Sequence, residues 1–261
     1  MKQDLRYSEY PVPPELAASV QGIWRLEGHC EQAAPHLVLP DGCICLVLNF
    51  GAPLQPASPA DASSVEKGHG LLGEIRRPLR VMAQGDVDLV GVRLLPGTSL
   101  DLCRVPLAEL VDSVAGESAL TAALGGLVRT LESAAPDERL QLLVDGLGDV
   151  AHKTGTPGSL LQAAVGRIFR SEGRLRIDAL AESLGTSRRS LERLFSLQLG
   201  FSPKSLCDVL RFQSAMRMAQ ARKAGNWADI ACAAGYFDQS HLIRDFRRFS
   251  GATPTGLDTG G

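Results

Sequence analysis

The stretch GYFDQSHLIRDFRRFSG, residues 235–251, carries the strongest structural signal in the chain. Its apolar residues Leu242, Phe246 and Phe249 recur at i, i+4 and i+7, a spacing that places them on one face of a helix. The other face carries Gln239, Ser240, Ile243, Arg244, Arg247 and Arg248. Such polar and basic side chains near the start of a helix are suited to reading base edges and contacting phosphates. A solvated surface helix is the alternative when this helix is considered alone.

A similar pattern occurs about 50 residues upstream. IDALAESLGTSRRSLERLF, from residue 177, corresponds approximately to WADIACAAGYFDQSHLIRDF, from residue 227. Each copy has an alanine-rich helix, a glycine turn, an N-cap residue (Ser187 or Asp238) and a second helix. Two copies are far less probable by chance than one, so the sequence predicts two helix-turn-helix units with two recognition helices.

Residues 203–223, PKSLCDVLRFQSAMRMAQARK, connect the two copies. They read as one helix that begins at Pro203 and is roughly 30 Å long. That length is close to the ~34 Å helical repeat of B-DNA. A rigid spacer of this length would place both recognition helices in successive major-groove segments on one side of a duplex. A further helix is expected before the first copy, over residues 160–170.

The charge of the chain is divided unevenly. The whole sequence has 27 Lys+Arg and 29 Asp+Glu, a net charge of −2, but residues 157–261 hold 15 basic and 9 acidic residues and carry +6. Residues 1–156 carry −8. The segment HKTGTPGS, residues 152–159, has the composition of a linker. We therefore predict two domains, residues 1–152 and 157–261, of which the second is suited to a polyanion.

The N-terminal half is predicted to be a small β-barrel or sandwich followed by helices, which makes the whole chain an α+β protein. Its runs rich in Val, Leu and Ile predict strands over residues 20–30, 36–50, 70–75 and 79–95, with turn signals at Pro40-Asp41-Gly42 and Gly85-Asp86. Residues 52–69 are rich in Pro, Ala and Ser and predict a loop. Helices are expected over residues 98–105, 106–114, 118–133 and 137–151.

Three motifs of the N-terminal half carry a family resemblance. PHLVLPDGCICLVLNFG, GEI and DLVGVRLLPGTSLDLCRVPLAELVDSV resemble, in that order, a cupin-like N-terminal domain of poorly characterised function that occurs on some AraC-type regulators. The resemblance covers roughly residues 8–115. It implies a sensory or dimerising barrel.

The C-terminal half resembles the AraC/XylS family of bacterial transcription regulators. The motifs are LAESLGTSRRSLERLF, LGFSPKSL, LRFQSAMRMA and IACAAGYFDQSHLIRDFRRFSGATP, and the resemblance covers residues 158–257. It implies an all-α domain with two helix-turn-helix motifs. Two departures are visible: Leu242 stands where family members often have Phe, and TGLDTGG replaces the usual aromatic and basic ending.

The resemblance also implies which side chains contact bases. The family positions fall on Arg189, Glu192, Arg193, Gln239, Ser240 and Arg244. Arg188, Arg247 and Arg248 complete the predicted DNA-binding set as phosphate contacts. Glu192 has two interpretations, because a carboxylate accepts a hydrogen bond from cytosine but repels phosphate. It either reads a base or holds Arg188 or Arg189 in place.

Cysteine and histidine residues leave a second possibility open in the N-terminal half. His29, Cys30, His36, Cys43 and Cys45 could sense a soft metal ion or an oxidant if their strands lie together. Buried cysteine is more often a small hydrophobe, and the sequence contains no pair of CxxC motifs, so we expect no metal site. The candidate residues for a small-molecule site are Trp24, Cys43, Cys45, Phe50 and Met82, and the alternative is that they are ordinary core residues.

Enzymatic activity is not expected. The five histidines form no HxH pair of the kind that metal-dependent cupins use, and the sequence has no GxSxG motif or glycine-rich phosphate loop. We therefore expect no catalytic residue and no cofactor. A cupin-type enzyme or a small-molecule binding protein remains the alternative class.

The expected partners follow from the DNA-binding interpretation. They are double-stranded promoter DNA, RNA polymerase, a small-molecule effector and a second copy of the chain. The N-terminus has no apolar signal-peptide region, and no apolar run approaches the ~20 residues of a membrane helix, so we expect a cytoplasmic protein without a membrane partner.

Overall fold

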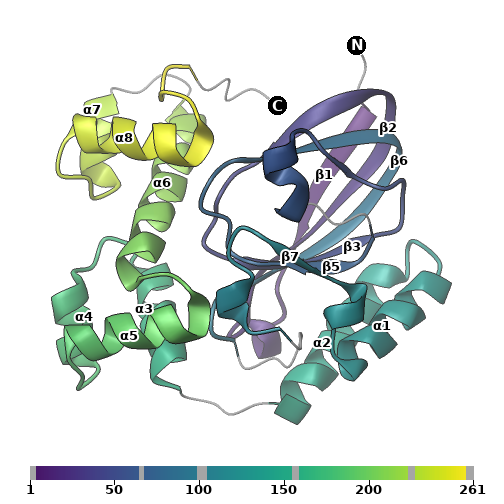
Figure 1. The fold of residues 1–261 in the computed structure, drawn as a ribbon, viewed down its shortest axis with the longest axis horizontal. Coiled ribbons are helices and arrows are strands. Elements are labelled where there is room, and N and C mark those ends of the chain that lie inside the picture. Colours follow the sequence, from purple (N-terminus) through teal and green to yellow (C-terminus); the bar gives the residue numbers. More distant parts are fainter. Residues whose placement is uncertain (1–3, 65–67, 99–104, 155–158, 223–226, 257–261) are drawn as a thin grey trace.

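The computed structural model describes residues 4–64, 68–98, 105–154, 159–222 and 227–256. It consists of an N-terminal antiparallel sheet with attached helices and a C-terminal group of helices (Figure 1). The predicted α+β fold with two domains is confirmed. In the described residues, no helix has both the length and the apolar character needed to cross a membrane.

Seven antiparallel strands form the N-terminal sheet, in the order β1-β2-β6-β3-β5-β7, with β4 paired to β6. They are β1 (Asp4–Tyr10), β2 (Val20–Val38), β3 (Ile44–Asn49), β4 (Gln55–Pro56), β5 (Gly70–Leu72), β6 (Leu79–Leu94) and β7 (Val114–Gly116). The two long strands, β2 and β6, pair along most of their length, with a register shift between Cys30 and Ala34. Such irregularities bend a strand, and β2 and β6 are both visibly curved in Figure 1.

The strand predictions were partly wrong. β1 was not predicted, although it pairs with β2 over its full length. The turn expected at Gly85-Asp86 is absent, because Gly85, with a φ of +84°, stays in the ladder opposite Cys30 and β6 continues through it. The turn at Pro40-Asp41-Gly42 does interrupt the predicted strand 36–50, so that β2 ends before it and β3 begins after it.

The predicted helix over 106–114 is also wrong. Only the short 3-10 helix η3 (Leu107–Glu109) forms there. The chain then turns through Asp112, at a φ of +55°, and β7 adds a strand to β5. A helix over 98–105 falls mostly on residues 99–104, which lie outside the described residues.

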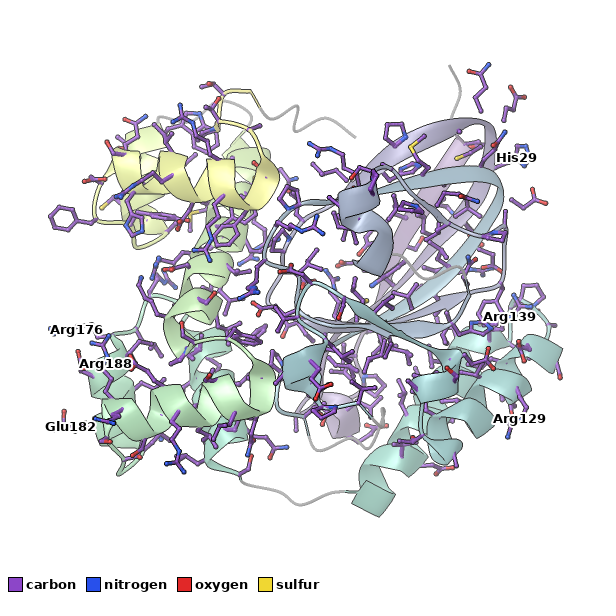
Figure 2. All side chains as sticks on the ribbon, viewed as in Figure 1. His29, Arg129, Arg139, Arg176, Glu182 and Arg188 are labelled. Carbon is purple, nitrogen blue, oxygen red and sulfur yellow. The ribbon has the colours of Figure 1, made fainter. Side chains whose placement is uncertain are left out.

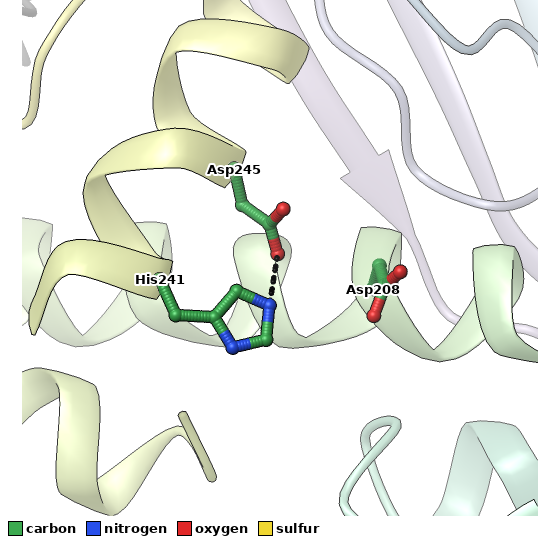
Figure 3. A group of neighbouring side chains, drawn as sticks. All are labelled: Asp208, His241 and Asp245. Carbon is green, nitrogen blue, oxygen red and sulfur yellow. Dashed lines mark ion pairs between the residues drawn. The ribbon is translucent and has the colours of Figure 1, made fainter. Parts of the chain in front are cut away.

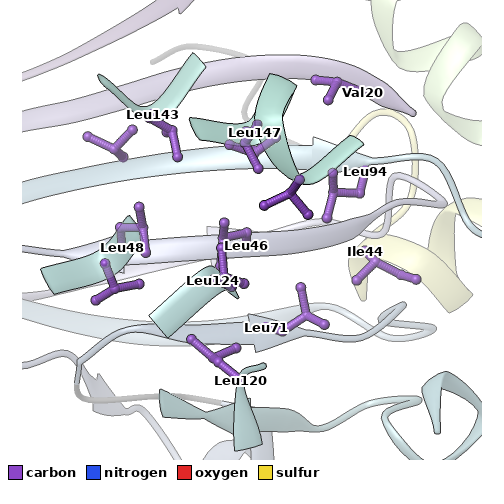
Figure 4. Close-up of a cluster of buried hydrophobic side chains, with 14 of the residues drawn as sticks. Val20, Ile44, Leu46, Leu48, Leu71, Leu94, Leu120, Leu124, Leu143 and Leu147 are labelled. Atoms are coloured by element: carbon purple, nitrogen blue, oxygen red, sulfur yellow. The ribbon is translucent and has the colours of Figure 1, made fainter. Parts of the chain in front are cut away.

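The two longer helices of this half, α1 (Ala122–Ser133) and α2 (Arg139–Thr154), lie close to their predicted positions. They cover one face of the sheet and complete its main core (Figure 4). Leu46 and Leu48 of β3 contribute from the sheet, Leu124 from α1, and Leu143 and Leu147 from α2. Short 3-10 helices, η1 (Pro14–Leu16), η2 (Pro59–Ser64) and η4 (Glu117–Ala119), complete the described elements of this half.

The C-terminal helices agree with the prediction to within one or two residues. They are α3 (Leu160–Arg170), α4 (Ile177–Ser183), α5 (Arg188–Leu199), α6 (Pro203–Arg222), α7 (Trp227–Ala233) and α8 (Gln239–Ser250). Two separate cores hold them: one lies around α3, α4, α5 and the first half of α6, and the other around the second half of α6, α7 and α8. α6 therefore contributes to both cores.

The loop of residues 39–42, between β2 and β3, rests on α6. Gln213 of α6 donates a hydrogen bond from Nε2 to the carbonyl oxygen of Pro40 at 2.6 Å. Gly42 has a φ of +78°, and a Cβ atom at this position would lie 2.8 Å from Leu206 Cδ1. Glycine is therefore required here both for its conformation and for its size. This contact joins the N-terminal half to the helix between the two helix-turn-helix units.

Candidate nucleic-acid interface

The first helix-turn-helix unit is built by α4 and α5. Gly185, at a φ of +65°, forms the turn, and the Ser187 side chain caps α5 by accepting a hydrogen bond from the Ser190 amide at 3.1 Å. Leu191 and Phe195 are fully buried on the inner face of α5. The cap and the buried face fix which side of α5 is exposed.

The second unit repeats this construction in α7 and α8. Asp238 caps α8 by accepting a hydrogen bond from the His241 amide at 2.7 Å. Leu242, Phe246 and Phe249 are fully buried, as the spacing in the sequence predicts. Phe246 packs edge-to-face on Phe212 of α6, with ring centroids 5.0 Å apart. The apolar face of this helix therefore packs on its own unit and on the spacer.

Both recognition helices point in the same sense relative to the N-terminal half. α5 ends at Gly200, which packs against Ala108, and α8 ends at Gly251, which lies near Pro78 and Arg80. Because both C-terminal ends face the N-terminal half, both N-terminal ends point away from it (Figure 1). The N-terminal end of a helix carries a partial positive charge, which attracts phosphate.

Most of the predicted DNA-binding side chains are exposed on these two helices. The exposed members of the set are Arg189 and Arg193 on α5, and Gln239, Ser240, Arg244, Arg247 and Arg248 on α8. Arg188 is also exposed, and Figure 2 shows it at the end of α5 that is remote from the sheet. The structure thus gathers basic side chains on each recognition helix.

Arg188 and Glu192 form a pair instead of standing free. Arg188 Nε donates to Glu192 Oε1 at 2.8 Å, and its Nη1 donates to Asp178 Oδ1 at 3.4 Å. The hydrogen bond with Glu192 is the largest cause of the raised pKa of Arg188. Glu192 therefore holds Arg188 in this structure, and Asp178 of α4 is a partner that the sequence reading missed.

Arg248 differs from the other arginines of α8. Its guanidinium lies 4.7 Å from the ring centroid of Phe249. Its charge also acts to lower the pKa of Glu74, in the N-terminal half, although burial dominates the pKa of that carboxyl group. Arg248 is therefore close enough to the N-terminal half to interact with it electrostatically.

Two exposed apolar side chains were also missed. Phe237, directly before the N-cap of α8, is 94% exposed, and Leu197 of α5 is 66% exposed. The pattern of apolar residues in the sequence does not distinguish these two exposed side chains from buried core residues. Apolar side chains at a recognition helix can contact the methyl group of thymine.

The predicted small-molecule residues of the N-terminal half do not form one group. Trp24 packs over Gly91 on the face of the sheet that also carries Cys45 and is opposite the helix-covered face. Phe50 instead packs against the helix-covered core, 4.0 Å below the Arg139 guanidinium. Met82 lies far along β6, opposite Pro35.

The surroundings of Cys43 and Cys45 favour the protonated thiol. Cys43 is buried and Cys45 is partly covered. Burial raises the pKa of the Cys45 thiol to about 12 and that of Cys43 well above its ordinary value. Thiols with raised pKa values are poor nucleophiles and poor metal ligands at neutral pH.

The register of the sheet also separates the predicted Cys/His group. His29 lies opposite Asp86, whereas Cys45 lies opposite Arg93 on the same strand. Seven residues of strand correspond to about 23 Å. His29 itself lies at an outer end of the sheet and contacts Asp86 at 2.6 Å (Figure 2). Within the described residues, the one group of three side chains able to hold a metal ion is Asp208, His241 and Asp245.

Comparison with known proteins assigns the two halves separately. Residues 180–259 match a family model described as a helix-turn-helix domain, and residues 8–116 match one described as a domain of unknown function (DUF6597). No curated protein sequence matches the chain.

Among solved structures, the chain is similar to an AraC-type transcriptional regulator from Chromobacterium violaceum. The identity is 31%, the match covers 37% of this chain and 86% of that chain, and the TM-score is 0.34. ToxT from Vibrio cholerae is 10% identical over 97% of each chain, with a TM-score of 0.48. The AraC-like transcriptional activator CuxR is 14% identical over 74% of each chain, with a TM-score of 0.30.

The match to the Chromobacterium regulator spans most of that protein, and the helix-turn-helix family model covers residues 180–259, which include both recognition helices. The chain therefore belongs to the AraC family of transcription regulators, with a C-terminal helix-turn-helix domain preceded by a domain of unknown function.

Proposed function

We propose that this chain regulates transcription by binding a promoter sequence-specifically, with α5 and α8 in successive major-groove segments of one duplex. The observation that carries the proposal is the common direction of the two recognition helices on either side of α6. α6 has 20 residues and is therefore about 30 Å long, close to one turn of B-DNA.

The exposed side chains divide into two roles under this proposal. Arg193, Gln239 and Arg244 are suited to base edges, because arginine forms a fork to guanine and glutamine a fork to adenine. The other family base-contact positions are Arg189, Glu192 and Ser240, of which Glu192 is paired with Arg188 in this structure. Arg247, about two turns beyond Ser240 on α8, is suited to phosphate. Arg188 reaches phosphate only after it leaves Glu192 and Asp178.

The direct test is binding of the full chain to its native promoter and to a scrambled duplex at two salt concentrations, followed by fluorescence anisotropy. We expect tighter binding to the promoter and a steep loss of affinity with salt. Arg193→Ala should weaken promoter binding, while Arg129→Ala, which removes an exposed arginine from α1, is the matched control and should not. An equal loss of promoter affinity in both variants would contradict the proposal that α5 contacts the DNA.

The N-terminal domain is proposed to control this binding through its contact with α6. The 39–42 loop touches α6 at Gln213 and Leu206, between the two units. A signal that moves this loop would change how the two recognition helices are held. We further propose that the protein is cytoplasmic and responds to a small-molecule effector. It is also proposed to dimerise and to contact RNA polymerase. The Cys/His group is not proposed as the sensor, because the sheet holds its members apart.

A further inference from the structure

Three side chains with metal-ligand chemistry meet between the spacer helix and the second recognition helix. His241 and Asp245 lie one turn apart on α8, and Asp208 faces them from α6 (Figure 3). One ligand atom from each lies within 4.8 Å of the other two. The group belongs to the interior side of the second helix-turn-helix unit and is separate from the exposed arginine surface.

Asp245 supplies the observation that points to a ligand. The residue is only 6% exposed, and its Oδ2 atom makes no hydrogen bond among the described residues. The buried Tyr236 hydroxyl lies near this carboxylate, and burial and the carboxylate together raise the pKa of the phenol, but the hydroxyl also makes no hydrogen bond there. The same oxygen lies 3.8 Å from His241 Nε2, so it is directed into the group. A buried carboxylate oxygen without a partner is costly, and a bound cation would remove that cost.

Asp208 retains a free coordination position. Lys204 and Arg211 both donate to its Oδ1 atom, and neither bonds Oδ2. Lys204 is half-exposed and can turn into solvent, whereas Arg211 is buried and also donates to the Gly173 carbonyl oxygen at 2.9 Å. An ion at this place would therefore face two carboxylates and one fixed guanidinium.

The second side of the histidine is closed by an aromatic ring. Tyr236 lies edge-to-face with His241, with ring centroids 5.2 Å apart. The imidazole is thus packed against a buried phenol ring.

We propose that Asp208, His241 and Asp245 form a binding site for a borderline transition-metal ion such as Zn²⁺. One imidazole nitrogen and two carboxylate oxygens make a three-ligand set, with water in the fourth position. Bond lengths of about 2.0–2.2 Å place tetrahedral ligand atoms about 3.4 Å apart, so the ligand atoms, now within 4.8 Å of one another, need to approach by up to about 1.4 Å. Mg²⁺ and Ca²⁺ prefer six or more oxygen ligands and do not fit this set.

A bound ion would link α6 directly to α8. The second recognition helix would then be held on the spacer by metal bonds in addition to its apolar face. Binding to the folded state alone raises its stability, so Zn²⁺ should increase the melting temperature. The effect on promoter binding rests on the proposed function, while metal binding itself does not.

The test is calorimetric titration of the metal-free full chain with Zn²⁺ in the presence of a competing chelator. We expect one ion per chain, and at least tenfold weaker binding for His241→Gln and for Asp245→Asn. Two matched controls should leave the affinity unchanged: Cys232→Ala removes an exposed thiol, and His29→Gln removes a histidine whose side chain is 55% exposed. Mg²⁺ should give no binding.

Substitution with Co²⁺ identifies the ligand atoms independently. The expected visible spectrum is that of a tetrahedral site without the sulfur-to-metal charge-transfer band. No binding, equal affinity in His241→Gln and the parent, or a sulfur band would overturn the inference. His241 is partly exposed, so its variant keeps the test valid even if Asp245→Asn does not fold. Promoter binding is measured separately, and its absence in a chain that binds Zn²⁺ would count against the proposed function alone.

Discussion

Glu74 is a buried carboxyl group of the N-terminal domain in surroundings that disfavour its charge. It is 2% exposed, and neither carboxyl oxygen has a hydrogen-bond donor among the described residues. Burial raises its pKa to about 8. Smaller effects come from Arg76, Asp112, Asp41 and Arg248, of which the arginines act to lower the pKa and the aspartates to raise it.

This carboxyl group should make the folded state lose stability as pH rises. The folded state holds the proton more tightly than the unfolded state, whose pKa is near 4.5, so stability falls from about pH 4.5 until about pH 8. Glu74→Gln should remove this loss, with little change at pH 4.5 and a gain on the order of several kcal/mol at pH 9. Urea unfolding of the parent and the variant at both pH values measures the difference in the free energy of unfolding. Glu117→Gln, an exposed control, should follow the parent, and parallel pH curves for Glu74→Gln would contradict the argument.

Arg244 and Arg248 should separate base reading from general attraction. Arg244→Ala should cost about 1–3 kcal/mol at one base position and change the ranking of operator variants. Arg248→Ala should weaken all operators similarly, because Arg248 is proposed to contact phosphate and not a base, and it should lower the salt slope by roughly one unit. A panel of single-base operator variants at two salt concentrations gives both quantities. The reverse outcome would mean that α8 is rotated differently in the groove.

At the scale of elements, the cap of α8 is the feature with the most direct energetic consequence. Asp238→Ala removes the side chain that accepts the His241 amide hydrogen bond and should cost about 1 kcal/mol. The melting temperature of the variant should fall, and promoter affinity should fall with it. Asp238→Asn retains an N-cap acceptor and should stay close to the parent. A full loss in Asp238→Asn would show that the charge, not the cap, is responsible.

Local signals decided which elements could be predicted from the sequence. The helix-turn-helix units were predictable because glycine turns, N-caps and i, i+4 apolar spacing all lie within about 20 residues. β1 and β7 depend on distant pairing partners, Leu26 and Leu71 among them, and local propensity does not reveal such partners. The dipeptide Gly85-Asp86 is typical of a turn and therefore predicts one. In the structure, pairing of Gly85 with Cys30 in the β2–β6 ladder overrides this local preference.

The candidate sites show the same limit. His241 and Asp245 are four residues apart, so their proximity was visible in the sequence, but Asp208 joins them only through the packing of α6 on α8. In the N-terminal domain, Trp24 and Cys45 do share a face. Phe50 was misplaced because it follows β3 directly and turns to the helix-covered side.

At the scale of the whole molecule, the contact between the 39–42 loop and α6 should hold the N-terminal half on the C-terminal helices. Gln213→Ala removes the hydrogen bond to the Pro40 carbonyl oxygen, which should increase amide hydrogen exchange at residues 41–43. Exchange in the centre of β6 should not change, because that strand is buried in the N-terminal sheet. Unchanged exchange at residues 41–43 would show that the loop is held by the sheet and not by α6.

The central claim is that α5 and α8 read one duplex about one helical turn apart, and a base-discrimination map tests it most directly. Binding of the parent, Arg193→Ala and Arg244→Ala is measured against a complete set of single-base variants of the native operator. Each substitution should abolish discrimination at its own position, and the two positions should be about 10 base pairs apart, the spacing that the roughly 30 Å helix α6 dictates. Adjacent or identical positions, or positions half a turn apart on opposite faces of the duplex, would contradict the account.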